Sequence, residues 1–114
     1  MAECLFCRIA QKQIPAQIEY EDEDVIAFRD IHPQAPVHIQ IIPKKHVDKV
    51  SDLSAGDAAL AGKLVIVAQT IARQKKVEND SFRLVFNNGA WSGQSVFHIH
   101  LHLLAGRRMG WPPG

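Results

Sequence analysis

Apolar and polar residues alternate strictly from Phe97 to Leu103, within the stretch from Gly93 to Leu104 near the C-terminal end of the chain. In this stretch His98, His100 and His102 are separated from one another by single apolar residues. A period of two residues is typical of a β-strand with one buried face, and residues on the same face follow each other at roughly 6.6 Å. The pattern therefore predicts that the three imidazoles line one wall of a pocket. The apolar residues expected to pack behind them are Phe97, Ile99, Leu101 and Leu103.

Four earlier segments have the composition of β-strands. Residues 18–20 and 25–29 are rich in β-branched and aromatic residues and flank an acidic turn, which predicts a hairpin. Residues 37–43 are apolar enough to form a central strand, and residues 82–86 are expected to form a fourth strand after a polar turn at 77–81. With the histidine-rich segment, these strands make a five-stranded, mainly antiparallel sheet.

The longest helical pattern runs from Ser54 to Lys76. Ser54 is followed three residues later by Asp57, which resembles a capping box, and lysines at the other end complement the helix dipole. Its apolar residues form one stripe of Leu60, Leu64, Val67 and Ile71 and a second stripe of Ala58, Ala61, Val65, Ala68 and Ala72. A helix that is apolar over so much of its circumference needs two covering surfaces. We expect these to be the sheet and a second subunit, with coverage by loops as the alternative.

A shorter helix is expected at the N-terminus, where Leu5, Phe6, Ile9 and Ile14 have helical spacing before the Ile14-Pro15 pair ends the helix. The length of 114 residues fits one domain, residues 1–114. Together the patterns predict an α+β domain that forms a homodimer. It would contain the five-stranded sheet, one long helix and the short N-terminal helix.

The composition is that of a globular protein, with 46% hydrophobic and 22% charged residues and a formal net charge of +1. This balance argues against a nucleic-acid partner, because such proteins usually carry a basic excess. The N-terminus lacks the basic and apolar regions of a signal peptide, and the apolar stretches are expected to be too short to span a bilayer. A cytoplasmic protein without a membrane partner is therefore expected.

Three histidines in one register are hard to explain by packing alone, although single strand histidines usually have a structural role. Histidines at alternate positions of a strand can also converge on a metal ion. However, no Asp or Glu occurs from Ser81 to the C-terminus, whereas Arg83, Arg107 and Arg108 do. Imidazole, hydroxyl, amide and guanidinium groups together suit an anionic substrate better. A carboxylate ligand from an earlier segment would keep the metal hypothesis open.

Cys4 and Cys7 form a Cys-x-x-Cys pair close to the N-terminus. In a reducing compartment, such a pair is more often a metal or redox site than a structural disulfide. A thioredoxin-like role requires a preceding strand, which this chain does not have. A zinc site requires two further ligands.

The His-x-His-x-His segment followed by two apolar residues resembles the signature of the histidine-triad (HIT) superfamily. The preceding Gly93-Gln94-Ser95-Val96 and the terminal Trp111-Pro112-Pro113-Gly114 are similar to its Hint branch in particular. The resemblance covers nearly the whole chain. It implies a purine nucleotide or nucleotidyl-amine substrate and a homodimer.

The resemblance also assigns roles to individual residues. It implies that Asp30 binds the ribose hydroxyls and that His38 supports the triad. The expected base pocket consists of Phe6, Ile9 and Phe28, and the expected phosphate site consists of Asn87, Gly93, Ser95, His100 and His102. Gln40 departs from the aliphatic residue that many Hint proteins have near the base. Trp111 is expected to reach the partner's site and shape leaving-group specificity.

The resemblance completes a possible zinc set, Cys4, Cys7, His46 and His98, which would be an ordinary structural zinc site. The alternative is two reduced thiols without metal. No metal is expected to take part in the chemistry.

The reaction implied is hydrolysis of the P–N bond of adenosine phosphoramidates. His100 would attack phosphorus as a neutral imidazole and form a nucleotidyl-histidine, with His102 and Ser95 assisting. Two alternatives are a dinucleoside polyphosphate hydrolase of a neighbouring HIT branch and a metal-dependent hydrolase. A role in binding without catalysis also stays open.

Overall fold

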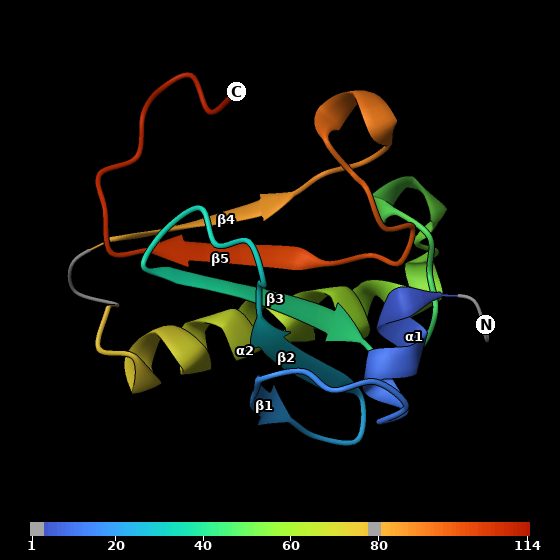
Figure 1. Ribbon diagram of the computed structural model, residues 1–114. Coiled ribbons are helices and arrows are strands. Elements are labelled where there is room, and N and C mark those ends of the chain that lie inside the picture. Colours follow the sequence, from blue (N-terminus) through green and yellow to red (C-terminus); the bar gives the residue numbers. More distant parts are fainter. Residues whose placement is uncertain (1–3, 78–80) are drawn as a thin grey trace.

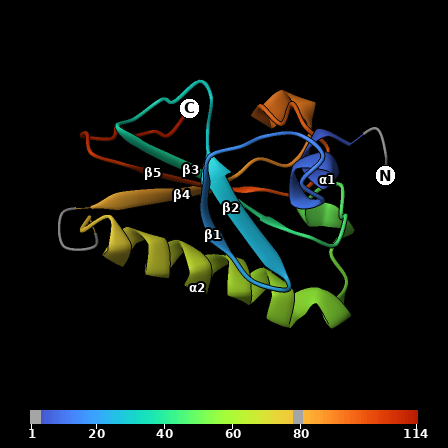
Figure 2. The ribbon, with the colours of Figure 1, turned by 60° about the horizontal axis from the view of Figure 1, so that its bottom comes forward.

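The computed structural model describes residues 4–77 and 81–114. Five strands form one antiparallel sheet in the order β1-β2-β3-β5-β4, with a long helix against one face and a short helix on the opposite side (Figures 1 and 2). The strands are β1 (Ile18–Glu21), β2 (Val25–Arg29), β3 (Val37–Pro43), β4 (Phe82–Phe86) and β5 (Leu101–Ala105), and the helices are α1 (Leu5–Ala10) and α2 (Ala58–Gln74). The predicted α+β architecture is therefore confirmed, and most of the polar turn expected at 77–81 lies outside the described residues.

Alternation along the central strands gives the sheet two different faces. The face that packs on α2 is apolar, and its core consists of Val25, Ala27, Ile39, Ile41, Leu101 and Leu103 against Leu64, Val67, Ala68 and Ile71. On the other face, Ile26, Phe28 and Ile42 pack against Phe6 and Ile9 of α1. Because side chains alternate, His38 and Gln40 share this second face with Ile42, and His102 lies opposite Gln40 on β5. The α2 core thus supports a polar surface on the other side of the sheet.

The start of α2 follows the predicted capping box. Ser54 and Asp57 exchange hydrogen bonds between their side chains and backbone N–H groups, although the first turn, Ala55–Asp57, is a 3-10 helix. Lys63 binds Asp22 and Asp24 at 3.1 and 3.0 Å, and Lys75 binds Glu19 at 2.6 Å, so ion pairs fasten α2 to the β1–β2 hairpin. The stretch Ala55–Gln74 is long and apolar enough to cross a membrane by length and composition, which corrects the expectation that no stretch is. Its Leu64, Val67 and Ile71 side chains pack on the sheet, as in the core helix of a soluble protein, whereas Val65 and Ile66 are exposed.

The predicted strand in the histidine-rich segment is wrong for its first half. β5 begins at Leu101, which pairs with Ile41, and β3 ends two residues beyond that at Pro43. The backbone before Leu101 therefore leaves the ladder, and Ile99 N–H donates to the Val47 carbonyl at 2.7 Å. Phe97 does not pack behind the histidines, since it is 43% exposed.

The expected end of the N-terminal helix is also wrong. α1 stops at Ala10, well before Ile14-Pro15, because Lys12 has a positive φ of 62° that no α-helix can continue. Within α1, Leu5 is exposed, whereas Phe6 and Ile9 are buried.

Candidate active site

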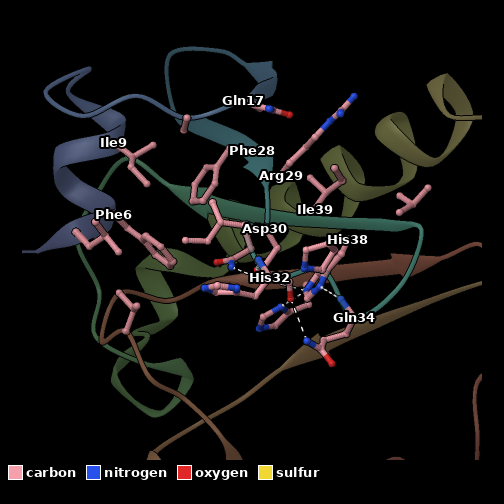
Figure 3. Close-up of a pocket in the computed structure, with 18 of the residues that line it drawn as sticks. Phe6, Ile9, Gln17, Phe28, Arg29, Asp30, His32, Gln34, His38 and Ile39 are labelled. Atoms are coloured by element: carbon pink, nitrogen blue, oxygen red, sulfur yellow. Dashed lines mark hydrogen bonds and ion pairs between the residues drawn. The ribbon is translucent and has the colours of Figure 1, made fainter.

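An open cavity of about 1290 Å³ lies on the sheet face opposite α2. Figure 3 shows Phe6 and Ile9 entering it from α1, Phe28 from β2, and Asp30 and His38 from the neighbouring loop and β3. The part of its wall that derives from the C-terminal third of the chain consists of Gly93, Ser95, Val96 and His102. The cavity therefore joins an apolar end to a polar end.

The apolar end is made by two aromatic rings in edge-to-face contact. The centroids of Phe6 and Phe28 are 5.3 Å apart at an interplanar angle of 70°. Ile9 lies buried in the same cluster. This surface suits a flat aromatic ligand, because rings favour such edge and offset arrangements.

His100 packs between this apolar end and His102. Its ring centroid lies 5.1 Å from that of Phe6 and 4.9 Å from that of His102, both of which line the cavity. Its Nδ1 lies 2.8 Å from the carbonyl oxygen of His98. A carbonyl only accepts, so Nδ1 carries the proton of the neutral ring and Nε2 keeps its lone pair. Burial lowers the pKa of His100, which favours this neutral form.

A chain of hydrogen bonds sets the tautomers of His38 and His102. The backbone N–H of Gln34 donates to Nδ1 of His38 at 3.0 Å, so His38 carries its proton on Nε2. That nitrogen donates to Nδ1 of His102 at 2.9 Å, and the neutral His102 ring therefore carries its own proton on Nε2. Burial lowers the pKa of His102 to about 4, so at neutral pH it is a hydrogen-bond donor without charge.

Asp30 follows β2 and lies beside the two histidines. Its Oδ1 accepts the backbone N–H of His32 at 2.8 Å, and its Oδ2 accepts Nε2 of Gln40 at 2.5 Å. Burial favours the neutral acid, but these two donors outweigh it and lower the pKa of Asp30. The cavity therefore contains one fixed carboxylate.

The loop between β4 and β5 contributes backbone to the cavity. Gly89 and Gly93 adopt φ values of +92° and +104°, which side chains other than glycine rarely tolerate. Next to Gly93, the Asn87 amide nitrogen lies 3.8 Å from the place where a Cβ would stand. Gly93 and Ser95 thus line the cavity and Asn87 lies next to Gly93, while their role as an oxyanion site stays a prediction.

Gln94 is a structural residue of this loop, and no role was predicted for it. Its side chain is buried, with an exposed fraction of 3%. Its Nε2 donates to the Asp48 and Val96 carbonyls at 2.7 and 3.1 Å, and its Oε1 accepts the Gly89 N–H at 2.8 Å. The available signal was a glutamine between two residues that line the cavity, but one of its partners, Asp48, is distant in sequence.

The two cysteines meet His46 and His98 next to the triad. Nδ1 of His98 lies 3.4 and 3.5 Å from Sγ of Cys4 and Cys7, and the two histidine Nδ1 atoms are 3.2 Å apart. A tetrahedral zinc ion, with bonds of about 2.0 Å to nitrogen and 2.3 Å to sulfur, separates its ligand atoms by roughly 3.3 to 3.8 Å. The four residues therefore have the spacing of a zinc set.

The hydrogen bonds around this cluster also point both lone pairs inward. Nε2 of His98 donates to the Pro43 carbonyl at 2.8 Å, and Nε2 of His46 donates to Oδ1 of Asp48 at 2.6 Å. Both Nδ1 atoms are then unprotonated in the neutral rings, and a cation between them would relieve their repulsion. Outer partners of this kind are typical of metal-binding histidines.

The three histidines thus have three different partners. His98 joins the cysteine cluster, His100 bonds a carbonyl and His102 pairs with His38. His102 also lies close to Asp30 and His38 in a second group with metal-ligand spacing, but His100 belongs to neither group within the described residues. The row therefore does not converge on one ion.

Trp111 does not line the cavity of its own chain among the described residues, and its predicted contact in a partner's site stays a prediction. Its side chain is 84% exposed and lies outside the cavity lining in the described residues. The Arg83 guanidinium donates to the Gly110 carbonyl at 2.8 Å, which fastens the C-terminal segment to β4. Any contact of Trp111 with a nucleotide would therefore have to be made in another subunit.

Comparison with known proteins gives the same assignment over almost the whole chain. The HIT domain model matches residues 11–109. An uncharacterized HIT-like protein of Synechocystis sp. is 50% identical over 110 residues, which cover 96% of each chain. The crystal structure of a HIT family hydrolase from Legionella pneumophila Philadelphia 1 is 50% identical, with a TM-score of 0.97 over 98% of this chain and 100% of that chain.

A more distant structure, the histidine triad nucleotide-binding protein from Candida albicans, has a TM-score of 0.83 and 28% identity over 96% of this chain and 83% of that chain. The fold, the histidine row and these similarities agree with one another. The chain therefore belongs to the HIT family and resembles that family's hydrolases.

Proposed function

We propose that this protein is a purine nucleoside phosphoramidase that hydrolyses the P–N bond of adenosine phosphoramidates. The observation that carries the proposal is the hydrogen bond from Nδ1 of His100 to the His98 carbonyl. It leaves Nε2 as a free lone pair, next to a cavity with one apolar and one polar end. A neutral imidazole held in this way is a competent nucleophile.

The nucleotide would lie along the cavity from its apolar to its polar end. The base would occupy the Phe6, Phe28 and Ile9 surface, and the ribose hydroxyls would donate to the Asp30 carboxylate. The phosphate would lie at Asn87, Gly93 and Ser95, where the backbone of a glycine-containing loop can approach an anion. This order places the α-phosphorus beside His100 and His102.

The reaction would proceed in two displacements. Nε2 of His100 forms a bond to phosphorus while the P–N bond breaks, and the departing nitrogen receives a proton from Ser95, relayed by His102. Water then attacks the nucleotidyl-histidine and returns a proton through His102 to Ser95, while the P–N bond to His100 breaks, which releases the nucleotide and restores the neutral ring. Throughout, Nε2–H of His102 and the loop backbone stabilise the phosphoryl oxygens.

We also propose that Cys4, Cys7, His46 and His98 hold a structural zinc ion, for which they have suitable donors and spacing. The bound ion would fix α1 onto the segment that precedes β5 and thereby hold Phe6 against His100. A cytoplasmic location remains a prediction.

A homodimer is part of the same proposal. On α2 the predicted small-residue stripe is only partly covered, because Ala68 and Ala72 are buried but Val65 is exposed beside Ile66. A second copy over this face and the β4 edge would bury these side chains and bring a Trp111 toward the neighbouring cavity. Sedimentation equilibrium should give twice the chain mass of 12.7 kDa, and Ile66→Glu should shift the population to monomers. A wild-type chain that stays monomeric at micromolar concentrations would refute this part.

Substrate comparison tests the function directly. Because the site is expected to assist an amine leaving group, kcat/KM should be at least about 10-fold higher for adenosine phosphoramidate than for diadenosine polyphosphates. Steady-state assays on both substrates with the same preparation supply the ratio. A reversed preference would favour the dinucleoside polyphosphate hydrolase, and no turnover of either substrate would contradict the proposed enzyme class.

A further inference from the structure

Gln40 occupies the centre of the cavity wall. Its Cα is paired with Phe28 on β2 and with His102 on β5. The side chain lines the cavity between the apolar end and the histidine pair, next to Asp30, which Figure 3 shows beneath Phe28. The amide group of a glutamine at this position needs hydrogen-bond partners for its nitrogen and its oxygen.

The Gln40 amide is oriented by Asp30. Nε2 donates to Oδ2 of Asp30 at 2.5 Å, and because a carboxylate only accepts, this contact determines which amide atom faces it. The other carboxylate oxygen is held by the His32 N–H at 2.8 Å. Each oxygen of Asp30 therefore has one fixed protein donor and retains further acceptor capacity for a ligand.

The opposite end of the amide has no partner. Among buried side-chain nitrogen and oxygen atoms of residues 4–77 and 81–114, Oε1 of Gln40 is the one that makes no hydrogen bond. Buried polar atoms in proteins almost always have a partner, so an unpaired one requires an explanation. Methionine would have nearly the same length and would not bury this atom. The contact with Asp30 is the feature that glutamine provides and methionine does not.

We propose that Gln40 is a positioning residue that sets the sugar specificity of the cavity by holding the Asp30 carboxylate in one orientation. The inference rests on the proposed function, because it takes the ligand of Asp30 to be a ribose. A ribonucleotide offers two neighbouring hydroxyl donors, and a 2′-deoxyribonucleotide offers one. A carboxylate held in the orientation that accepts two hydroxyl donors binds the deoxy sugar more weakly, because one of the two hydrogen bonds is lost. A mobile carboxylate can reorient toward the single remaining hydroxyl and so discriminates less between the two sugars.

The experiment compares Gln40→Met with the wild-type chain. Dissociation constants are measured for AMP and 2′-deoxy-AMP, and kcat and KM for the corresponding phosphoramidates. The wild type should prefer the ribose form by about 10-fold or more, and Gln40→Met should reduce this preference to about 3-fold or less, through KM rather than kcat. Gln40→Leu provides a second apolar variant in case one does not fold, and Gln74→Met, at an exposed glutamine at the end of α2, is the matched control.

A double-mutant cycle tests whether Gln40 acts through Asp30. In an Asp30→Asn background, Gln40→Met should produce no further change in the sugar preference, since the two residues act as one unit. A Gln40→Met chain with wild-type preference, or one that weakens both nucleotides equally, would overturn the inference. Equal binding of the two nucleotides by the wild type would also overturn it but leave the proposed function intact. A wild type that binds neither nucleotide would overturn the proposed function itself.

Discussion

Replacing His100 with alanine is expected to lower kcat for adenosine phosphoramidate by about 10⁴-fold or more. The reason is that the free Nε2 of this ring, left unprotonated by the Nδ1 contact with the His98 carbonyl, is the proposed nucleophile. The affinity for AMP should change by no more than a few-fold, because the base, ribose and phosphate surfaces stay in place. Rapid mixing followed by mass spectrometry should detect a nucleotide adduct on the peptide that contains His100.

Two controls make this result specific. Phe97→Ala alters the same segment at an exposed side chain and should keep wild-type turnover within a few-fold. AMP binding by the His100→Ala chain reports that the cavity is still folded. Unchanged turnover in this variant, or an adduct on a peptide without His100, would show that the nucleophile has been assigned to the wrong residue.

Removal of metal is expected to affect stability much more than chemistry. Elemental analysis of the purified chain should find one zinc per protomer, and a strong chelator should lower Tm by on the order of 10 °C or more. The ligand cluster joins α1 to the segment before β5, so its loss frees an end of the chain that packs on the cavity. At a temperature where the metal-free chain stays folded, kcat should remain within about 10-fold of its initial value.

The Cys4→Ser/Cys7→Ser double variant serves as the matched comparison. It should resemble the chelated wild type in Tm and should not respond to chelator or to added zinc. A chelated chain that is folded but inactive, and that regains turnover with zinc, would instead support the metal-dependent hydrolase. A wild type with neither zinc nor a response to chelator would refute the proposed zinc site.

The local sequence pattern was sufficient to predict which segments form helices and which form strands for most elements. The hairpin, the central strand and the capped long helix were predicted from alternation, β-branched composition and the Ser54–Asp57 spacing, all of which act within a few residues. The start of the last strand was predicted wrongly because a distant partner decides it, whereas the end of α1 is decided by the positive φ of Lys12. β5 begins only at Leu101 because β3 has almost ended opposite it, and no local pattern contains that information.

For the candidate site, too, some features could be predicted from the sequence and others depend on the tertiary structure. The sequence by itself determined the histidine row, the cysteine pair and the glycine-containing loop, because these are residue types at fixed spacing, and the family resemblance singled out Asp30. Only the tertiary structure decided what each group does: which nitrogen of each imidazole is free, how Gln94 braces its loop, and that Gln40 holds Asp30. The physical reason is that a tautomer or a carboxylate orientation depends on a hydrogen-bond partner, and here several of those partners come from distant parts of the chain.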